Sequence, residues 1–355
     1  MIVSITADAP ASTPAAVLAA ATASGLAARS LPDGRGGIAI GVGGTLASSV
    51  LDLPGIGEIR PVHKPFMLAS LEMRPASTVM VGDVSIGNGA PVIMAGPCSV
   101  EGRESLIETA RAVKAAGARI LRGGAFKPRT SPYSFQGLGE EGLQHLAAAR
   151  DVTGLPVVTE VMEPDQVEVV AAYADMLQVG ARNMANFPLL KRVGRSDKPV
   201  LLKRGFAATV EEWLMSAEYI LAHGNPNVVL CERGIRGFDA MFRFNLDLNV
   251  VPAVRELSHL PVIVDPSHGT GKRSLVGRMA LAGLAAGADG LMIEVHLDPD
   301  RSMCDGAQTI TPAELARIHR TGMAVHAAIA EADEAEDAVA CFPLTKDQER
   351  VALTA

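Results

Sequence analysis

The sequence predicts an α/β protein in which a (β/α)8 TIM barrel follows a small N-terminal domain with a ferredoxin-like order of elements. The chain has 355 residues, enough for one α/β barrel of about 250 residues and an accessory domain. After residue 90, short apolar runs alternate with helical segments, as in parallel strands joined by crossover helices. The first 65 residues instead combine short strands with an Ala-rich helix.

Residues 1–65 fit the order βαββαβ of a ferredoxin-like domain. In chain order, we expect a strand at 2–5, a helix at 13–24 capped by Ser12 or Thr13, strands at 26–31 and 37–42, a helix at 45–51 and a strand at 57–63. Residues 66–90 are predicted to be a linker and then a hairpin that turns at Gly82-Asp83.

Residues 91–327 contain eight apolar runs, and nearly all are continuous, as expected for parallel strands buried on both faces. They cover residues 92–99, 119–124, 157–161, 176–181, 200–205, 228–234, 262–268 and 291–296, with helices expected between them, such as 104–116, 164–174, 210–223 and 275–286. An open doubly wound sheet is the alternative, but it usually has fewer strands and its Gly-rich phosphate-binding sequence is missing. Residues 328–355 are predicted to be a solvated helical extension and a loose end.

Composition excludes several classes of protein. The formal net charge of −7 argues against a dedicated nucleic-acid binder. The N-terminal apolar stretch has no basic residue before Arg29, unlike a secretory leader, and no run of about 20 apolar residues could span a membrane. The four cysteines are far apart, which suits a reducing compartment. We therefore expect a cytoplasmic protein with no membrane or nucleic-acid partner.

Charged or reactive side chains stand at the end of every predicted barrel strand, where barrel enzymes place their active sites. These are Cys98, Arg122, Glu160, Arg182, Lys203, Arg204, Glu232, Arg233, His268, Glu294 and His296. Between residues 109 and 139 the chain has no acid but contains Arg111, Lys114, Arg119, Arg122, Lys127 and Arg129. Any one of these could be an ordinary surface cation, but the set predicts a small-molecule substrate with at least two anionic groups.

A second group, Cys98, His268, Glu294 and Asp305, predicts a metal site. Strands one, seven and eight are neighbours in a closed barrel, so these side chains can meet. One thiol, one imidazole and two carboxylates suit a divalent transition metal such as Mn, Fe, Co or Zn. Each residue also has an ordinary structural explanation, so the spacing alone leaves this site open.

Seven segments together resemble a known family. The segments AGPCSVEGRE (95–104), LRGGAFKPRTSPYSFQGLG (121–139), QVGARN (178–183), LLKRGF (201–206), LCERGIR (230–236), VDPSHGTGKR (264–273) and EVH (294–296) closely resemble 3-deoxy-D-arabino-heptulosonate 7-phosphate (DAHP) synthase of the short bacterial type, type I beta. The resemblance covers residues 64–325, and residues 1–65 look like the regulatory domain of some members.

The resemblance implies an activity and a set of site residues. The family condenses phosphoenolpyruvate with erythrose 4-phosphate to DAHP and phosphate, the entry step to aromatic amino acids. It implies that Cys98, His268, Glu294 and Asp305 bind the metal, that Arg122, Lys127, Ala181, Arg182, Lys203 and Arg233 bind phosphoenolpyruvate, and that Arg129 and Thr130 bind erythrose 4-phosphate. Lys127 is the candidate general acid/base, with a pKa that we expect neighbouring cations to lower, and His268 is expected to act beside it.

Alternatives remain open. The sister enzyme that uses arabinose 5-phosphate typically has Ala-Asn-Arg-Ser where this chain has Lys127-Pro128-Arg129-Thr130, which favours erythrose 4-phosphate. A catalytically silent scaffold and a paralogue in secondary metabolism are two further candidates. The resemblance also implies an aromatic amino acid effector at the N-terminal domain and a homo-oligomer, either a dimer or a tetramer.

Overall fold

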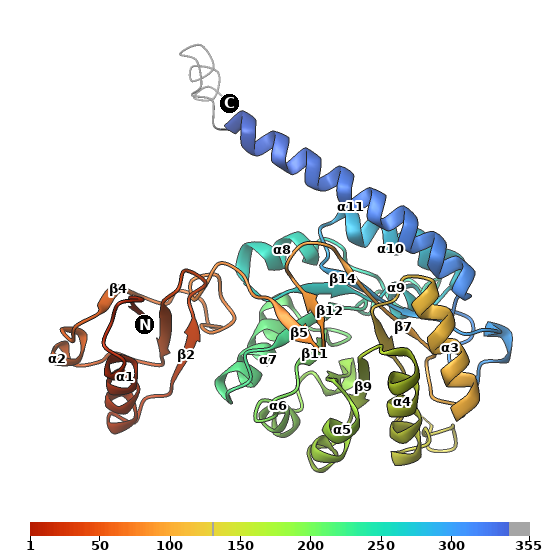
Figure 1. Cartoon of the computed structure of the whole chain (residues 1–355), viewed down its shortest axis with the longest axis horizontal. Helices are drawn as coiled ribbons and strands as arrows, with labels where there is room; N and C mark the ends of the chain where they lie inside the picture. Colours follow the sequence, from red (N-terminus) through yellow and green to blue (C-terminus); the bar gives the residue numbers. More distant parts are fainter. Residues whose placement is uncertain (130, 341–355) are drawn as a thin grey trace.

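The computed structural model describes residues 1–129 and 131–340. Its first elements form a four-stranded antiparallel sheet in the order β2-β3-β1-β4, covered by two helices (Figure 1). They are β1 (Ile2–Ile5), α1 (Ser12–Ala23), β2 (Ala28–Pro32), β3 (Ile38–Val42), α2 (Ser48–Leu51) and β4 (Ile56–Arg60). The predicted ferredoxin-like order is confirmed. The predicted side-chain cap of α1 is wrong, because Ala11 precedes the helix and Thr13 donates a hydrogen bond to the Pro54 carbonyl instead.

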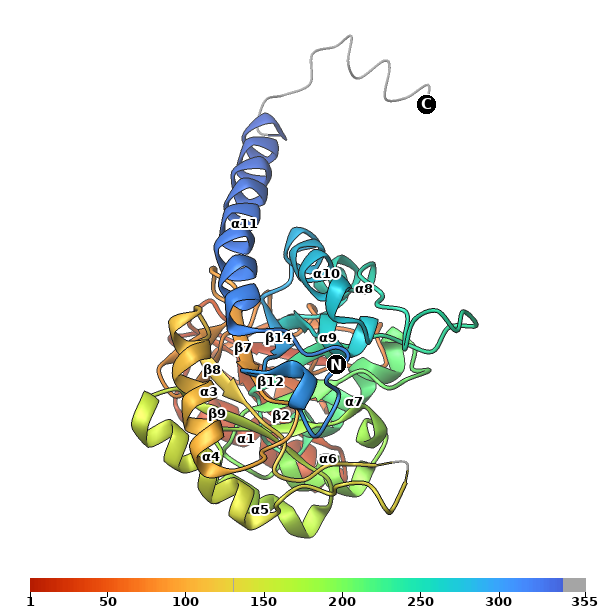
Figure 2. The ribbon, with the colours of Figure 1, turned by 90° about the vertical axis from the view of Figure 1, so that its right-hand side faces the viewer.

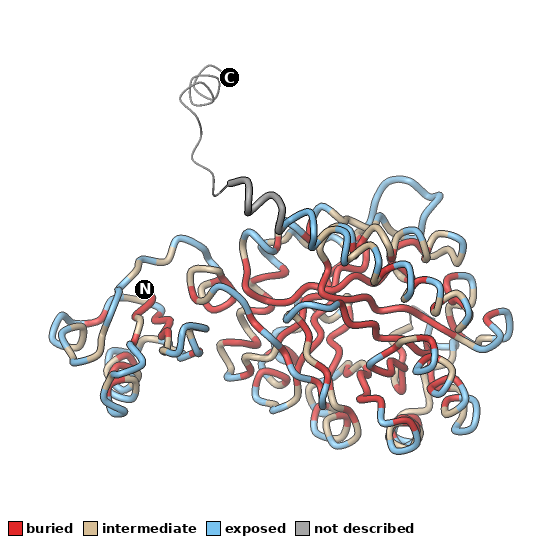
Figure 3. Tube along the Cα trace, turned by 45° about the horizontal axis from the view of Figure 1, so that its top comes forward, coloured by how far each residue is buried: buried red, intermediate tan, exposed pale blue. Residues whose placement is uncertain are grey.

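Eight parallel strands then close into a barrel in the order β10-β11-β12-β13-β14-β7-β8-β9, which confirms the predicted fold class. The strands are β7 (Val92–Gly96), β8 (Ile120–Arg122), β9 (Val157–Val161), β10 (Met176–Val179), β11 (Val200–Lys203), β12 (Val228–Glu232), β13 (Val262–Val264) and β14 (Gly290–Glu294). β14 pairs with β7 from Gly290 beside Val92 to Glu294 beside Gly96, and this pairing closes the barrel. Buried residues line the interior, and exposed residues lie on the outer helices (Figure 3).

Helices surround the barrel because each parallel strand needs a crossover that covers it. They are α3 (Arg103–Ala115), α4 (Glu140–Thr153), η1 (Pro164–Gln166), α5 (Val167–Tyr173), η2 (Ala181–Asn183), α6 (Phe187–Val193), α7 (Val210–Ala222), α8 (Val250–Leu257), α9 (Pro266–Thr270), α10 (Arg273–Ala285), η3 (Pro299–Arg301) and α11 (Pro312–Ala340). A hairpin of β5 (Val79–Val81) and β6 (Val84–Ile86) turns at Gly82-Asp83, as predicted. Its four valine and isoleucine side chains join the core formed by inward-facing strand residues.

The segment between the two parts of the chain is packed against the barrel. Phe66, Leu68 and Met73 are buried, and the carboxylate of Glu218 on α7 accepts hydrogen bonds from the Leu68 and Ala69 amides. His259 joins the same segment through the Leu68 carbonyl.

The last helix, α11, begins on the barrel beside α3 and α10 and then projects beyond it (Figure 2). Residues 327, 328 and 330–333 of α11 are exposed, and the predicted loose end at 341–355 lies outside the described residues. Within residues 1–129 and 131–340, none of the helices has the length and apolar composition to cross a membrane.

Candidate active site

A cavity of about 300 Å³ opens at the carboxyl ends of the barrel strands. Eleven residues line it: Lys127, Pro128, Arg129, Ser131, Ser134, Glu160, Arg182, Arg233, Arg243, His268 and Asp305. Five of these side chains are permanently cationic, so the cavity suits an anionic ligand. Most of them were predicted from the sequence. Ser131 and Ser134 were not, although they lie within the motif at 121–139, and Arg243 lies outside all the motifs and strand ends.

The four predicted metal ligands meet on one side of this cavity. Cys98 Sγ lies 3.6 Å from Asp305 Oδ2, and His268 Nε2 lies 3.4 Å from Glu294 Oε1. The donor atoms of His268, Glu294 and Asp305 all lie within 4.8 Å of one another, and so do those of Cys98, Cys304 and Asp305. Asp305 therefore links a thiol pair to a His–Glu pair.

Local backbone features place these side chains. A Cβ at Gly96 would collide with the Arg122 carbonyl, so only glycine lets β7 approach β8 closely before the chain reaches Cys98. Asp305 is the one non-glycine residue with a positive φ, +54°, among the residues that the structure describes. Its left-handed backbone is uncommon and is typical of positions that the surroundings enforce.

Burial and charge shift the pKa values of this cluster. The pKa of Cys98 is raised well above its usual value by the hydrogen bond to Cys304, 2.9 Å away, and by burial. Burial and the neighbouring Cys98 raise the pKa of Glu294 to about 7. Burial would also raise the pKa of Asp305, but the adjacent Arg243 lowers it. The neutral forms of Cys98 and Glu294 are therefore favoured, whereas Asp305 is held ionised, and a metal bound among the three would offset the cost of ionising the first two.

Lys127 corrects one prediction. Its ammonium group is buried and lies 3.2 Å from Cys98 Sγ and 3.0 Å from the Cys98 carbonyl. Burial lowers its pKa, but the neighbouring sulfur groups of Cys98 and Cys304 outweigh burial and raise it. The expected lowering by neighbouring cations is wrong, because sulfur rather than cationic side chains lies closest. Lys127 is therefore a protonated donor.

Asp265 is the main residue that sequence reasoning missed. It is fully buried, and its Oδ2 atom accepts hydrogen bonds from Lys203 Nζ at 2.6 Å and from His268 Nδ1 at 2.7 Å. Burial would raise its pKa, but His268 and Lys203 hold the pKa well below its usual value. Because Asp265 accepts from Nδ1, the His268 Nε2 atom is left to face Glu294. Asp265 lies inside the motif at 264–273, three residues before His268.

The other predicted phosphoenolpyruvate residues surround the same mouth. Arg122 is buried, its Nη1 atom lies 3.4 Å from Glu294 Oε1, and its Nε atom has no hydrogen-bond partner among the described residues. The Arg233 guanidinium lies 3.9 Å from the centre of the Phe244 ring, which fixes its plane. Ala181 and Arg182 begin η2 at the end of β10.

The predicted erythrose 4-phosphate residues are described in part. The Arg129 Nε donates a hydrogen bond to the Phe135 carbonyl, which orients its side chain along the cavity wall. Thr130 lies outside the described residues.

Some predicted cations lie elsewhere. Arg111 and Lys114 are on α3, and Arg119 lies before β8, at the opposite end of that strand from Arg122. The predicted grouping of these three cations with Arg122 is therefore wrong, because residues that are close along the chain are separated in space by a helix or a strand. Arg204 is paired with carboxylates of the protein rather than free for a substrate, since its Nη1 atom lies 3.1 Å from Glu232 and 3.0 Å from Asp247.

Comparison with known proteins agrees with this geometry. Residues 68–331 match the model of the DAHP synthetase I family. The chain belongs to this family. The family predicted from the sequence motifs is therefore confirmed, and with it the assignment of the chain to a family of enzymes.

The chain is also similar to individual proteins of known name. A phospho-2-dehydro-3-deoxyheptonate aldolase of Thermotoga maritima is 54% identical over 250 residues, covering 70% of this chain and 74% of the relative. A crystal structure of the DAHP synthase of Thermotoga maritima has 42% identity and a TM-score of 0.71, covering 95% of this chain and 97% of that one. A 2-dehydro-3-deoxyphosphooctonate aldolase of Magnetococcus marinus is more distant, with 34% identity over 290 residues, covering 72% of this chain and 98% of the relative.

Proposed function

We propose that this chain condenses phosphoenolpyruvate with erythrose 4-phosphate to give DAHP and inorganic phosphate, the first step of the shikimate pathway. The observation that carries this proposal is the cavity at the strand ends, where lysine and arginine side chains surround the Cys98–His268–Glu294–Asp305 group. Two phosphorylated substrates repel each other in water, and a cationic cavity offsets that repulsion while it positions them.

The four donor residues fit a divalent transition metal, whether Mn, Fe, Co or Zn. Their donor atoms converge, and the mixed thiol, imidazole and carboxylate set matches such ions better than Mg or Ca. Cys98, His268, Glu294 and Asp305 would hold the metal. When bound, it supplies Lewis-acid polarisation of the aldehyde oxygen.

The remaining residues hold the substrates and move protons. We assign phosphoenolpyruvate to Arg122, Lys127, Ala181, Arg182, Lys203 and Arg233, and the aldose phosphate to Arg129 and Thr130. The enol carbon bonds to the aldehyde carbon, and we assign to Lys127 the proton that turns the aldehyde oxygen into a hydroxyl. Water then adds to C2 of the former phosphoenolpyruvate and returns one proton to Lys127. Cleavage of the C2–O bond to the phosphate then leaves a ketone at C2, and the departing phosphate takes the second proton of the water.

A direct assay tests the substrate and the metal together. Consumption of phosphoenolpyruvate would be followed with erythrose 4-phosphate and with arabinose 5-phosphate, each with and without a chelator. We expect turnover with the four-carbon sugar alone, and we expect the chelator to abolish it. Turnover only with arabinose 5-phosphate would move the assignment to the sister reaction, and activity with neither sugar after addition of Mn or Co would overturn the proposal.

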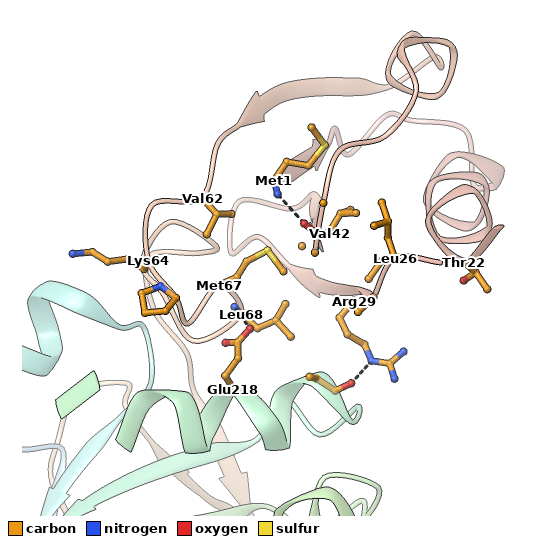
Figure 4. Close-up of a pocket in the computed structure, with 17 residues that line it drawn as sticks. Met1, Thr22, Leu26, Arg29, Val42, Val62, Lys64, Met67, Leu68 and Glu218 are labelled. Atoms are coloured by element: carbon orange, nitrogen blue, oxygen red, sulfur yellow. Dashed lines mark hydrogen bonds between the residues drawn. The ribbon is translucent and has the colours of Figure 1, made fainter. Parts of the chain in front are cut away.

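We also propose that residues 1–65 form a regulatory domain that binds an aromatic amino acid, within a homo-oligomeric (dimeric or tetrameric) cytoplasmic enzyme. A cleft of about 590 Å³ between this part and α7 supports the idea of a ligand there (Figure 4). Leu26, Met67 and Leu68 in its lining would contact an apolar body, and Arg29 is the nearby cation, although its Nε donates to the Ala222 carbonyl (Figure 4). Thermal unfolding in the presence of Phe, Tyr or Trp tests this, and we expect at least one to raise the melting temperature and lower activity. Flat responses to all three would retire the idea.

A further inference from the structure

We propose that Gln308 is a positioning residue that holds the carboxylates of Glu294 and Asp305 in the arrangement that binds the metal. This inference rests on the proposed metal site and adds a residue that contributes no ligand atom.

Gln308 connects three charged side chains at once. It is 2% exposed, and its amide nitrogen lies 2.6 Å from Glu294 Oε2 and 3.5 Å from Asp305 Oδ2. Its amide oxygen accepts a hydrogen bond from Arg243 at 2.8 Å. Because a guanidinium can only donate, the oxygen must face Arg243, and the NH2 group must face the carboxylates.

The loop after β14 builds this bridge into the backbone. The backbone N–H of Gln308 donates to the backbone carbonyl of Asp305 at 3.1 Å, across the turn that the positive φ of Asp305 begins. Two residues later, the Ile310 amide donates to the Glu294 carbonyl at 3.0 Å. The loop is therefore fixed to the strand end at the point where Gln308 reaches across from one carboxylate to the other.

The bonds of Gln308 decide which oxygen of Glu294 faces the metal donors. Since Gln308 holds Oε2, the other oxygen, Oε1, faces His268 Nε2 and Arg122 Nη1, each at 3.4 Å. A neutral amide can do this without adding a further positive charge beside the carboxylates, whereas a lysine would compete with the metal. Outer partners of this kind typically set metal affinity by about 10- to 100-fold.

The test measures binding of Co²⁺ by competition with a chromophoric chelator, together with the cobalt–thiolate absorption band, in the full chain. Gln308→Met removes both hydrogen-bonding ends at similar volume, and we expect a dissociation constant about 10- to 100-fold higher. Gln308→Asn keeps an amide that is one methylene too short to join Glu294 and Arg243, and we expect a smaller increase in the same direction. The thiolate band should persist at saturating cobalt, because Cys98 is untouched.

Gln178→Met is the matched control. Gln178 is also buried and donates to a carboxylate, Glu160 Oε2, at 3.1 Å, but Glu160 is not among the metal donors. We expect this variant to bind Co²⁺ as tightly as the wild type, even if it unfolds at a lower temperature. Equal affinity of Gln308→Met and the wild type would overturn the positioning role alone. A wild-type chain that binds no Co²⁺ would instead overturn the proposed metal site.

Discussion

The two main concavities of the molecule differ in size and in chemistry. The cleft between the N-terminal part and α7 has about twice the volume of the barrel mouth, 590 Å³ against 300 Å³. Many of its lining side chains are apolar, and two of its charged side chains bind the chain itself: Glu218 accepts from two amides, and Arg29 donates to the Ala222 carbonyl. The mouth instead gathers buried ions whose partners are other functional groups, such as Lys203 and His268 on Asp265.

This difference indicates where chemistry takes place. Burying an ionised group costs several kcal/mol unless partners compensate it, so a chain retains a buried, mutually paired set mainly where it has a use. A large cavity volume carries no comparable cost, so volume alone does not indicate a functional site. The smaller cavity is therefore the candidate active site, and the following experiments test whether the two regions respond as differently as their chemistry suggests.

The largest effect is expected from Cys98→Ala. Removing the thiol takes away one of the four proposed metal ligands, and loss of the metal should lower turnover about a thousandfold or more, since such catalysis is worth several kcal/mol. Turnover of phosphoenolpyruvate with and without added Mn²⁺ measures this, and circular dichroism checks the fold. Cys231→Ala is the control, because Cys231 is also fully buried in a strand but lies in the apolar core. An active, chelator-insensitive Cys98→Ala enzyme would disprove the ligand assignment.

The second-largest effect is expected from Asp265→Asn. Asparagine leaves the buried Lys203 without its partner and allows His268 to rotate, so we expect a stability loss of about 3–5 kcal/mol and a kcat/KM loss of about 10- to 100-fold. Asp289→Asn is matched to it, since Asp289 is a buried carboxylate that pairs with Arg255 at 2.9 Å before β14, at the opposite end of that strand from Glu294. We expect Asp289→Asn to lower stability with kcat/KM unchanged. An equal loss of activity in both variants would show that buried carboxylates at the barrel mouth matter no more for catalysis than buried carboxylates elsewhere.

The same contrast explains what could be predicted from the sequence. The barrel was predictable because most strands are runs of apolar residues, and the proposed metal ligands Cys98, His268 and Glu294 lie at or shortly after the ends of strands. Arg243 and Gln308 were not predictable in the same way, because both lie in loops, and only the three-dimensional path of each loop brings them to the candidate active site. Arg119 illustrates the opposite error. It is close to Arg122 along the chain and was therefore predicted to lie near it, but β8 separates the two residues in space.

A third prediction concerns pH and the junction between the two regions. Burial lowers the pKa of His259 from its usual 6.5 to about 4, and the neutral ring is bonded to Ser77 Oγ at 2.6 Å beside Arg74. Because the folded-state pKa is depressed, this stabilisation is present above pH 6.5 and is lost as the pH falls toward 4. The expected loss is about 3 kcal/mol.

His259→Gln isolates that contribution, because glutamine can keep a hydrogen bond without titrating. Unfolding free energies of both proteins between pH 7 and 4.5 provide the measurement, and the difference between them should shrink or reverse as the pH falls. A constant difference would show that His259 does not stay neutral at the junction.

The smallest effect is expected from Arg29→Met in the cleft. The Arg29 Nε donates to the Ala222 carbonyl at the end of α7 at 2.7 Å, a contact between the N-terminal part and the barrel. The side chain is exposed, so losing this bond should cost less than about 1 kcal/mol and leave kcat/KM unchanged. Lys64→Met is the control, because it removes the other cation lining the cleft without removing this bond. Hydrogen exchange at the end of α7 should rise only in Arg29→Met. A tenfold fall in kcat/KM would mean that the cleft takes part in catalysis, and the division between the two regions would then fail.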